Sequence, residues 1–228
     1  EEVRSYVLSA VRTLLETPVE AVVIACNTAT SVAIRELRER YPIPIVGMEP
    51  AVKPAVEMNR ASGRRVLVTA TPLTLREAKY NELVKRVDDR AIVDSLPLPE
   101  LVDFCEQLQF DGREIETYFA KKFSGVKWAD YGTIVLGCTH FPFYRPVLSK
   151  ILPRHVNIVD GSGGTVRRLM EVIGYREEES VERGEGTIRF GHSGGDEEYV
   201  KRMESAYRRY GEMMLGMREA EKTGGNRK

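Results

Sequence analysis

Short apolar runs alternate with longer amphipathic stretches over most of the chain. In residues 1–16, Val3, Val7, Val11 and Leu15 recur every four positions, which predicts that the sequence opens in an amphipathic helix. The later apolar runs are short and rich in β-branched residues, which predicts strands, several of them covered on both faces. These predicted strands lie at 21–25, 41–47, 64–70, 90–95, 133–138, 155–160 and 186–195.

Charged stretches with helical propensity lie between these runs. They predict helices at 28–40, 74–87, 99–109, 113–123, 145–152, 165–174 and 196–214. Strands that alternate with helices favour parallel sheets built from βαβ units, so the predicted fold class is α/β. The acidic run at 176–180 predicts a solvated loop, and the polar stretch at 221–228 predicts a frayed end.

Composition narrows the class of protein. Among 228 residues, 34 Lys+Arg balance 34 Asp+Glu, which gives no electrostatic case for a nucleic acid or a membrane surface as partner. No apolar run reaches the roughly 20 residues that a membrane-spanning helix needs. The three cysteines, Cys26, Cys105 and Cys138, are an odd number, which favours reduced thiols in a cytoplasmic protein over a disulfide framework.

Two of these cysteines stand in matching contexts. "VVIACNTA" (22–29) and "IVLGCTH" (134–140) each carry an apolar run to a cysteine and continue with small polar residues. Cys26 and Cys138 therefore stand where a parallel strand ends and a helix is about to begin. Ligands bind at this edge of open α/β sheets, and the following backbone N–H groups favour an anion there. The side chains that follow add hydrogen-bonding groups at the same edge: Asn27, Thr28, Thr139 and His140.

Each cysteine alone also has a structural interpretation, because free cysteine is among the most buried residue types. Two cysteines in matched strand-end positions make a shared chemical role the better hypothesis. A zinc site built from Cys26, Cys138 and His140 is a further alternative, although the sequence lacks the close Cys-x-x-Cys pairs of structural zinc sites. The same lack argues against a redox pair.

Two thiols that face each other across a cleft suit proton transfer on the two faces of one carbon atom. One of them must be a thiolate that removes a proton, the other a thiol that returns one, and the roles exchange in the reverse direction. Inversion of a carbon acid at its stereocentre is the natural outcome. The cysteine pattern therefore favours a racemase.

With these residues in place, the sequence resembles the cofactor-independent glutamate racemases of the aspartate/glutamate racemase superfamily, from the opening helix to about residue 212. The motifs that carry the resemblance are "IACNTAT", "PIVGMEPAVKPA", "TPLTLREAKY", "IVLGCTHFPFYRPVL", "IVDGSGGT" and "HSGGDEEYV". The two cysteine motifs together are specific, and "GCTHFP" is the more diagnostic. Aspartate racemases and maleate isomerases keep the cysteines and vary the flanks.

The resemblance implies interconversion of L- and D-glutamate without pyridoxal phosphate or another cofactor, supplying D-glutamate for peptidoglycan. It implies that Cys26 and Cys138 are the two acid/base residues and that His140 assists Cys138. It implies that the substrate is bound by Asn27, Thr28, Thr71, Thr74, Thr139 and His140, with Glu106 near the active site. The expected partner is glutamate, and a homodimer is left open.

The family fold is a pair of similar, flavodoxin-like parallel-sheet α/β domains with the active site between them. Chain order then assigns residues 1–49 and 156–228 to the first domain and 50–155 to the second. In the family, an Asp-Ser-Gly-x-Gly-Gly loop and a later Pro-Tyr-Gly segment contact the substrate, and neither appears before "EEVRSYVL" at the start of this sequence. We therefore expect the 228-residue chain alone to racemise L-glutamate slowly or not at all. An enzyme of the same superfamily that acts on aspartate or another small diacid, and a non-catalytic protein that binds an acidic ligand, are the alternatives.

Overall fold

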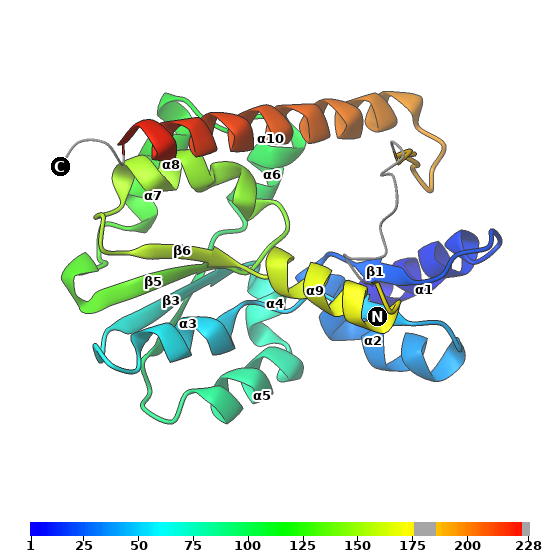
Figure 1. Cartoon of the computed structure of the whole chain (residues 1–228), viewed down its shortest axis with the longest axis horizontal. Coiled ribbons are helices and arrows are strands. Elements are labelled where there is room, and N and C mark those ends of the chain that lie inside the picture. Colours follow the sequence, from blue (N-terminus) through cyan, green and yellow to red (C-terminus); the bar gives the residue numbers. More distant parts are fainter. Residues whose placement is uncertain (176–185, 225–228) are drawn as a thin grey trace.

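A computed structural model describes residues 1–175 and 186–224 (Figure 1). Its strands are parallel and lie in two sheets, which confirms the α/β class. The strands are β1 (Val22–Ile24), β2 (Ile45–Gly47), β3 (Arg65–Ala70), β4 (Val93–Pro97), β5 (Tyr131–Leu136) and β6 (Asn157–Asp160). The helices are α1 (Glu2–Leu14), α2 (Asn27–Arg40), α3 (Val52–Asn59), α4 (Pro72–Arg76), α5 (Ala78–Val87), α6 (Glu100–Glu106), α7 (Arg113–Lys122), α8 (Arg145–Ile151), α9 (Ser162–Val172) and α10 (Glu197–Gly224), with 3-10 turns η1 (Trp128–Asp130) and η2 (Phe141–Tyr144).

The larger sheet has the strand order β4-β3-β5-β6 and is covered on both faces. Figure 1 shows α3 and α5 below it and α7, α8 and α10 above it. Successive side chains of a strand point to opposite faces, so Val66 and Val68 pack on the α3–α5 side while Leu67 joins the other core. This second core is the larger one and contains the ring of Phe119 and the phenol of Tyr144. Burial on both faces explains why these strands are continuous apolar runs.

The smaller sheet consists of β1 and β2, and it lies to the right in Figure 1 with α1 and α2. Helix α1 packs on α2, and Val11, Ile34 and Leu37 form a third core with the two strands. The spacing of Val3, Val7, Val11 and Leu15 was a correct prediction of α1. The molecule therefore has two parallel sheets, and each sheet has its own edge at which the carboxyl ends of its strands lie.

The last part of the chain differs from the expected division into domains. Strand β6 pairs with β5 in the larger sheet, and α10 packs on the core of that sheet through Ala206 and Met213. Helix α9, in contrast, contacts β2 of the smaller sheet. The chain after residue 156 is therefore shared between the two sheets, whereas the prediction assigned all of 156–228 to the first. The reason is that strand pairing across a sheet is non-local, and chain order alone does not specify it.

Two other predictions are corrected. Residues 186–195 form no strand; Ile188 is exposed and the ring of Phe190 packs on Tyr207 instead of on a sheet. The helix predicted at 74–87 is divided at Glu77, which adopts an extended conformation between α4 and α5. The acidic run 176–180 and residues 225–228 lie outside the described residues, and α10 includes the first four residues of the stretch expected to fray.

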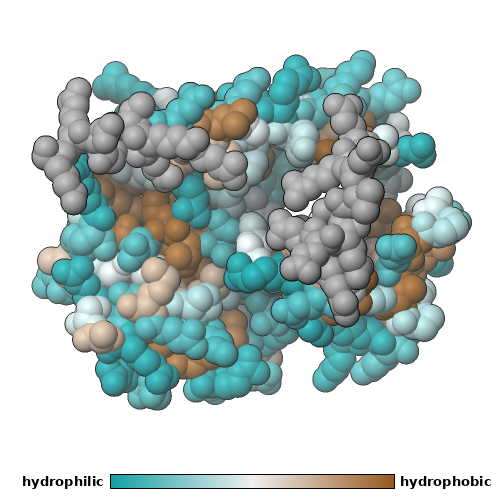
Figure 2. All heavy atoms as spheres, viewed as in Figure 1, coloured by the Kyte–Doolittle hydropathy of each residue, from teal (hydrophilic) through white to brown (hydrophobic). Residues whose placement is uncertain are grey.

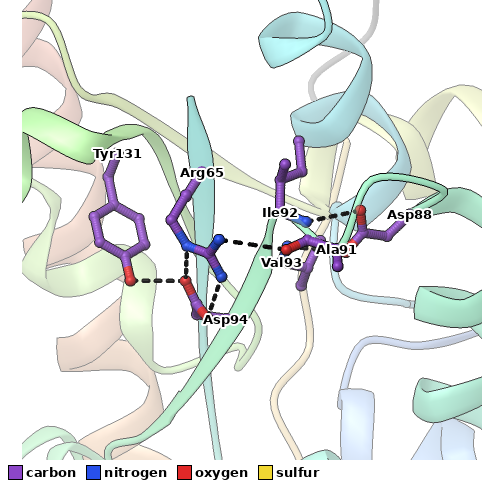
Figure 3. Close-up of polar contacts among 7 residues, drawn as sticks. All are labelled: Arg65, Asp88, Ala91, Ile92, Val93, Asp94 and Tyr131. Atoms are coloured by element: carbon purple, nitrogen blue, oxygen red, sulfur yellow. Dashed lines mark hydrogen bonds and ion pairs between the residues drawn. The ribbon is translucent and has the colours of Figure 1, made fainter. Parts of the chain in front are cut away.

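The amino ends of β3, β4 and β5 are tied together by one cluster of polar side chains (Figure 3). Arg65 donates two hydrogen bonds to the carboxylate of Asp94, at 2.5 and 2.6 Å, and the Tyr131 hydroxyl donates a third at 2.7 Å. Asp88 accepts from the backbone N–H groups of Ile92 and Val93 at the start of β4. This cluster lies at the opposite edge of the sheet from the strand ends that carry Cys138.

Figure 2 shows apolar surface below α10, over β6 and α8. A groove of about 720 Å³ opens there, and its apolar lining includes Leu152, Val156, Ile158, Met214 and Met217. None of the residues that line this groove belongs to the expected site. Within residues 1–175 and 186–224, no helix is both long and apolar enough to span a bilayer.

Candidate active site

The two cysteines lie at the carboxyl ends of β1 and β5, as their sequence contexts predict. Cys26 follows β1 and caps α2; its sulfur accepts a hydrogen bond from the Ala29 N–H at 3.4 Å. Cys138 follows β5 and is buried. The Gly137 N–H donates to the Thr69 carbonyl at 2.7 Å, and a Cβ at residue 137 would lie 2.7 Å from the same oxygen. Only glycine therefore allows the chain to pass β3 so closely just before it turns to Cys138.

The environments of the two thiols are unequal. Cys26 is exposed, whereas burial raises the pKa of the Cys138 thiol to about 11. The backbone N–H groups of His140 and Thr139 act in the opposite direction and favour the thiolate of Cys138. A negative charge on Cys26 acts in the same direction as burial and raises the pKa of Cys138 further.

A series of hydrogen-bonding contacts connects Cys138 to His140, then to Glu106, and then to Tyr199. His140 Nδ1 lies 3.6 Å from the Cys138 sulfur, and His140 Nε2 lies 2.9 Å from Oε1 of Glu106. A carboxylate only accepts hydrogen bonds, so Nε2 carries the proton and Nδ1 has a lone pair directed at Cys138. The other carboxylate oxygen of Glu106 accepts from the Tyr199 hydroxyl at 2.7 Å.

The charge of Glu106 is maintained by these neighbours. Burial raises the pKa of Glu106, but the hydrogen bonds from His140 and Tyr199 and the positive charge of Arg202 outweigh it, so the pKa lies below its ordinary value. Glu106 is thus a carboxylate at neutral pH. The sequence alone placed it near the site only by resemblance, and the structure brings it into direct contact with His140.

Three threonine hydroxyls connect the smaller sheet and its helices to the larger sheet and its helices. Thr28, in the first turn of α2, lies 2.8 Å from the Thr74 hydroxyl and 3.2 Å from the Thr71 hydroxyl. Thr71 and Thr74 also bond to each other at 3.1 Å, and Thr71 caps α4. The Thr-x-x-Thr spacing puts both hydroxyls on one turn, facing the strand end that carries Cys26.

Asn27 and Thr139 directly follow the two cysteines. Asn27 is buried, with a relative exposure of 3%, and its Oδ1 has no hydrogen-bond partner among the described residues. An unsatisfied buried carbonyl costs about 1–3 kcal/mol, so such an atom calls for a donor. Thr139 is partly exposed between Cys138 and His140.

The structure therefore brings the expected residues together in two groups, one around each strand end. Sequence reasoning missed Tyr199 and Arg202, which reach Glu106 from α10, 93 and 96 positions along the chain. The only signal was the presence of Tyr199 in "HSGGDEEYV", a motif noted for its resemblance and not for a contact. Among the described residues, no group of three or more His, Cys, Asp and Glu side chains is arranged to hold a metal ion.

Comparison with known proteins identifies the family of this chain. The sequence model of the family described as Asp/Glu/Hydantoin racemase matches residues 1–169. The chain belongs to this family. It is 50% identical over 197 residues to the glutamate racemase of Halothermothrix orenii, covering 86% of this chain and 77% of the relative. It is 42% identical over 216 residues to glutamate racemase 2 of Bacillus subtilis, covering 93% and 79%.

Solved structures share the fold. The Escherichia coli glutamate racemase, in complex with L-glutamate and the activator UDP-MurNAc-ala, matches with a TM-score of 0.67 and 29% identity. That match covers 76% of this chain and 65% of the other, so the chain spans slightly less than two thirds of that structure. The glutamate racemase of Campylobacter jejuni matches with a TM-score of 0.71 at 22% identity, over 89% and 78% of the two chains. The resemblance stated from the motifs is thereby confirmed.

Proposed function

We propose that this protein interconverts L- and D-glutamate, with Cys26 and Cys138 as the two acid/base residues and no cofactor. The observation that carries the proposal is that the two thiols stand at the carboxyl ends of two parallel strands, Cys26 after β1 and Cys138 after β5, and that each is followed by polar side chains. The names of its relatives supply the substrate. D-Glutamate made in this way would serve the synthesis of peptidoglycan in the cytoplasm.

The reaction moves one proton off and one proton on. The thiolate of one cysteine takes the α-proton, and the electron pair of the broken C–H bond stays on the α-carbon, delocalised into the adjacent carboxylate. The thiol of the other cysteine then gives its proton to the opposite face of that carbon, which inverts the centre and leaves a thiolate. In the next turnover the roles are exchanged. Burial raises the pKa of Cys138, which favours the protonated form of this sulfur that the proton-returning step requires.

The other expected residues are assigned by their hydrogen-bonding capacity. Asn27 has a buried acceptor that suits the substrate ammonium group. The hydroxyls of Thr28, Thr71 and Thr74 and the Thr139 side chain suit the carboxylates. His140 assists Cys138 through Nδ1 by taking the thiol proton when Cys138 is to act as the base, which leaves a thiolate beside an imidazolium, and it also binds the substrate. The substrate would lie between the unit that contains β1 and β2 and the unit that contains β3 and β5, and the active protein is proposed to be a homodimer.

Exchange of the α-proton in deuterated water tests the proposal. Proton NMR detects this exchange over hours, so it registers even slow turnover. We expect exchange with L- and D-glutamate, and its loss in Cys26→Ser and in Cys138→Ser. Cys105→Ala is the matched control, because Cys105 is buried in the core next to the site and has no role in the proposed reaction. Exchange with aspartate but not with glutamate would overturn the substrate. Glutamate binding by calorimetry without any exchange would overturn the reaction.

A further inference from the structure

The segment 192–200, "HSGGDEEYV", forms a hydrogen-bonded turn and the first residues of α10. The His192 carbonyl accepts from the Gly195 N–H at 3.0 Å, and Gly195 adopts a φ of +68°, which only glycine adopts without strain. Asp196 then accepts from the backbone N–H groups of Glu198 and Tyr199 through one carboxylate oxygen, at 2.9 and 3.1 Å. A capping carboxylate of this kind fixes the direction in which a helix begins. The first turn of α10, including Tyr199, is thereby set in place.

Tyr199 is held from several sides. Its hydroxyl donates to Oε2 of Glu106 at 2.7 Å. Its ring stacks on the imidazole of His192 with the centroids 4.6 Å apart, and the guanidinium of Arg202 lies over the ring at 5.5 Å. A tyrosine with a stacked ring and a bonded hydroxyl has little freedom, so the position of its oxygen is well defined.

The two oxygens of Glu106 have different partners. Oε2 takes the Tyr199 hydroxyl and Oε1 takes His140 Nε2, so fixing one oxygen fixes the plane of the carboxylate and the direction of the other. The imidazole ring is in turn directed at the Cys138 sulfur through Nδ1. The four groups therefore form one chain of contacts from α10 to the thiol.

We propose that Tyr199 is a positioning residue: its hydroxyl orients the carboxylate of Glu106 so that His140 presents the lone pair of Nδ1 to Cys138. This inference rests on the proposed racemase function for its meaning in catalysis, but the contacts themselves do not depend on it. The role of the motif "HSGGDEEYV" is then to place the Tyr199 hydroxyl against Glu106, on the side of the carboxylate away from His140.

The rest of α10 supports this arrangement. Arg209 donates to the Leu108 carbonyl at 2.7 Å and Arg202 reaches the Glu106 carbonyl at 3.5 Å, both just at the end of α6. Helix α10 therefore cannot shift along α6 without moving Tyr199 away from Glu106. The charged and titratable groups around the carboxylate are Cys105 on the same helix, Cys138 and His140 after β5, and Tyr199 and Arg202 on α10.

The test compares Tyr199→Phe with Tyr118→Phe. Tyr118 on α7 donates its hydroxyl to Glu100 at 2.8 Å, so the control removes the same kind of bond from a glutamate of the same helix, away from His140. The first readout is the rate at which iodoacetamide alkylates Cys138, followed by mass spectrometry of the Cys138 peptide near neutral pH. A less well oriented His140 takes the thiol proton less readily, so we expect Tyr199→Phe to slow alkylation about three- to tenfold. Tyr118→Phe should leave it unchanged.

The second readout separates positioning from a loss of folded protein. The equilibrium constant between enantiomers is one, so kcat/KM must change equally in both directions. The deuterium isotope effects measured with α-deuterated substrates can change differently in the two directions. If Tyr199→Phe slows proton removal by Cys138, the isotope effect should rise for the enantiomer that Cys138 deprotonates and fall for the other enantiomer. The Cys138→Ser variant identifies which enantiomer that is. A merely structural loss would lower both rates and leave both isotope effects as they are.

The possible results all discriminate. Slower alkylation together with diverging isotope effects supports the positioning role. Slower alkylation in a protein that exchanges no α-proton of glutamate supports the positioning of His140 and rejects the proposed function. Unchanged alkylation of Cys138 in Tyr199→Phe, with the thermal unfolding midpoint within a degree or so of the Tyr118→Phe control, overturns the inference whatever the turnover.

Discussion

Neutralising Glu106 should weaken the proton transfer at Cys138 without dismantling the site. In Glu106→Gln the amide oxygen still accepts from His140 Nε2, and the Tyr199 hydroxyl can rotate to accept from the amide nitrogen, so both contacts survive in form. The variant loses the negative charge that faces the imidazolium formed when His140 takes the proton of Cys138. The perturbation is therefore electrostatic.

The size of the effect follows from the contact. At the observed 2.9 Å, a charge pair is worth about 1.4 kcal/mol in bulk water and about twice that at half the dielectric constant. The side chains of His140 and Glu106 are 30% and 39% exposed, so solvent screens much of the interaction. A loss of about 1 to 2 kcal/mol of transition-state stabilisation is therefore expected, which is roughly a 5- to 30-fold fall in kcat/KM.

Circular dichroism of glutamate racemisation, or α-proton exchange by NMR where turnover is slow, measures this loss. Glu100→Gln is the matched control: Glu100 is on the same helix, accepts from Tyr118 at 2.8 Å and pairs with Lys122 at 3.1 Å, but touches no residue of the site. We expect the control to retain nearly full activity. If Glu106→Gln loses less than twofold, or no more than Glu100→Gln, then the charge of Glu106 does not act on Cys138 through His140.

Three further changes test the scaffold. Asp94→Asn should lower the free energy of unfolding in urea by about 1 kcal/mol at pH 7, a modest amount because the ion pair with Arg65 is partly exposed. The hydrogen bonds from Arg65 hold the pKa of Asp94 below 3.8, so this contribution to stability is present above pH 4 and should be lost as the pH falls further. Asn59→Ala should cost about 2–3 kcal/mol in the same assay, because it leaves the buried Thr133 hydroxyl without a donor. Gly137→Ala should lower both the unfolding midpoint and the α-proton exchange, the latter about tenfold or more, since its Cβ would overlap a backbone oxygen.

The elements were predictable where a local signal defines them. Buried parallel strands are continuous apolar runs, so β3 and β5 follow from "RRVLVTA" and "TIVLGC". The run "GTIRF" is also apolar and β-branched, but a strand forms only where a neighbouring strand can pair with it, and residues 186–190 pair with no strand. Helix α3 was not predicted, since Pro54 in its first turn interrupts the pattern. The first failure concerns a missing tertiary partner, and the second concerns a local proline signal that points away from a helix.

The site divides in the same way. Cys26 and Cys138 were found because each ends a strand, which is a local signal. Thr71 and Thr74 were expected only from the resemblance to the family, and nothing in the sequence indicated that the Thr28 hydroxyl contacts both of them. The bond between Tyr199 and Glu106 joins positions 93 apart and has no sequence signature. Groups that support a functional side chain are therefore the part of a site that only a structure reveals.

Unequal support of the two thiols has a kinetic consequence under the proposed function. Cys138 is buried and backed by His140, Glu106 and Tyr199, whereas Cys26 is exposed and has the Ala29 N–H at its sulfur. The equilibrium constant of a racemisation is one, so this inequality cannot appear in kcat/KM, which must be the same for both enantiomers. It must appear in kcat and KM taken separately, because the two forms of the enzyme, each with a different cysteine ionised, differ in free energy. The enantiomer that needs the less stable form should show the lower apparent affinity and the higher kcat. Equal kcat and equal KM for L- and D-glutamate would mean that the two sulfurs ionise equally well, and that the contacts behind Cys138 fully compensate for its burial.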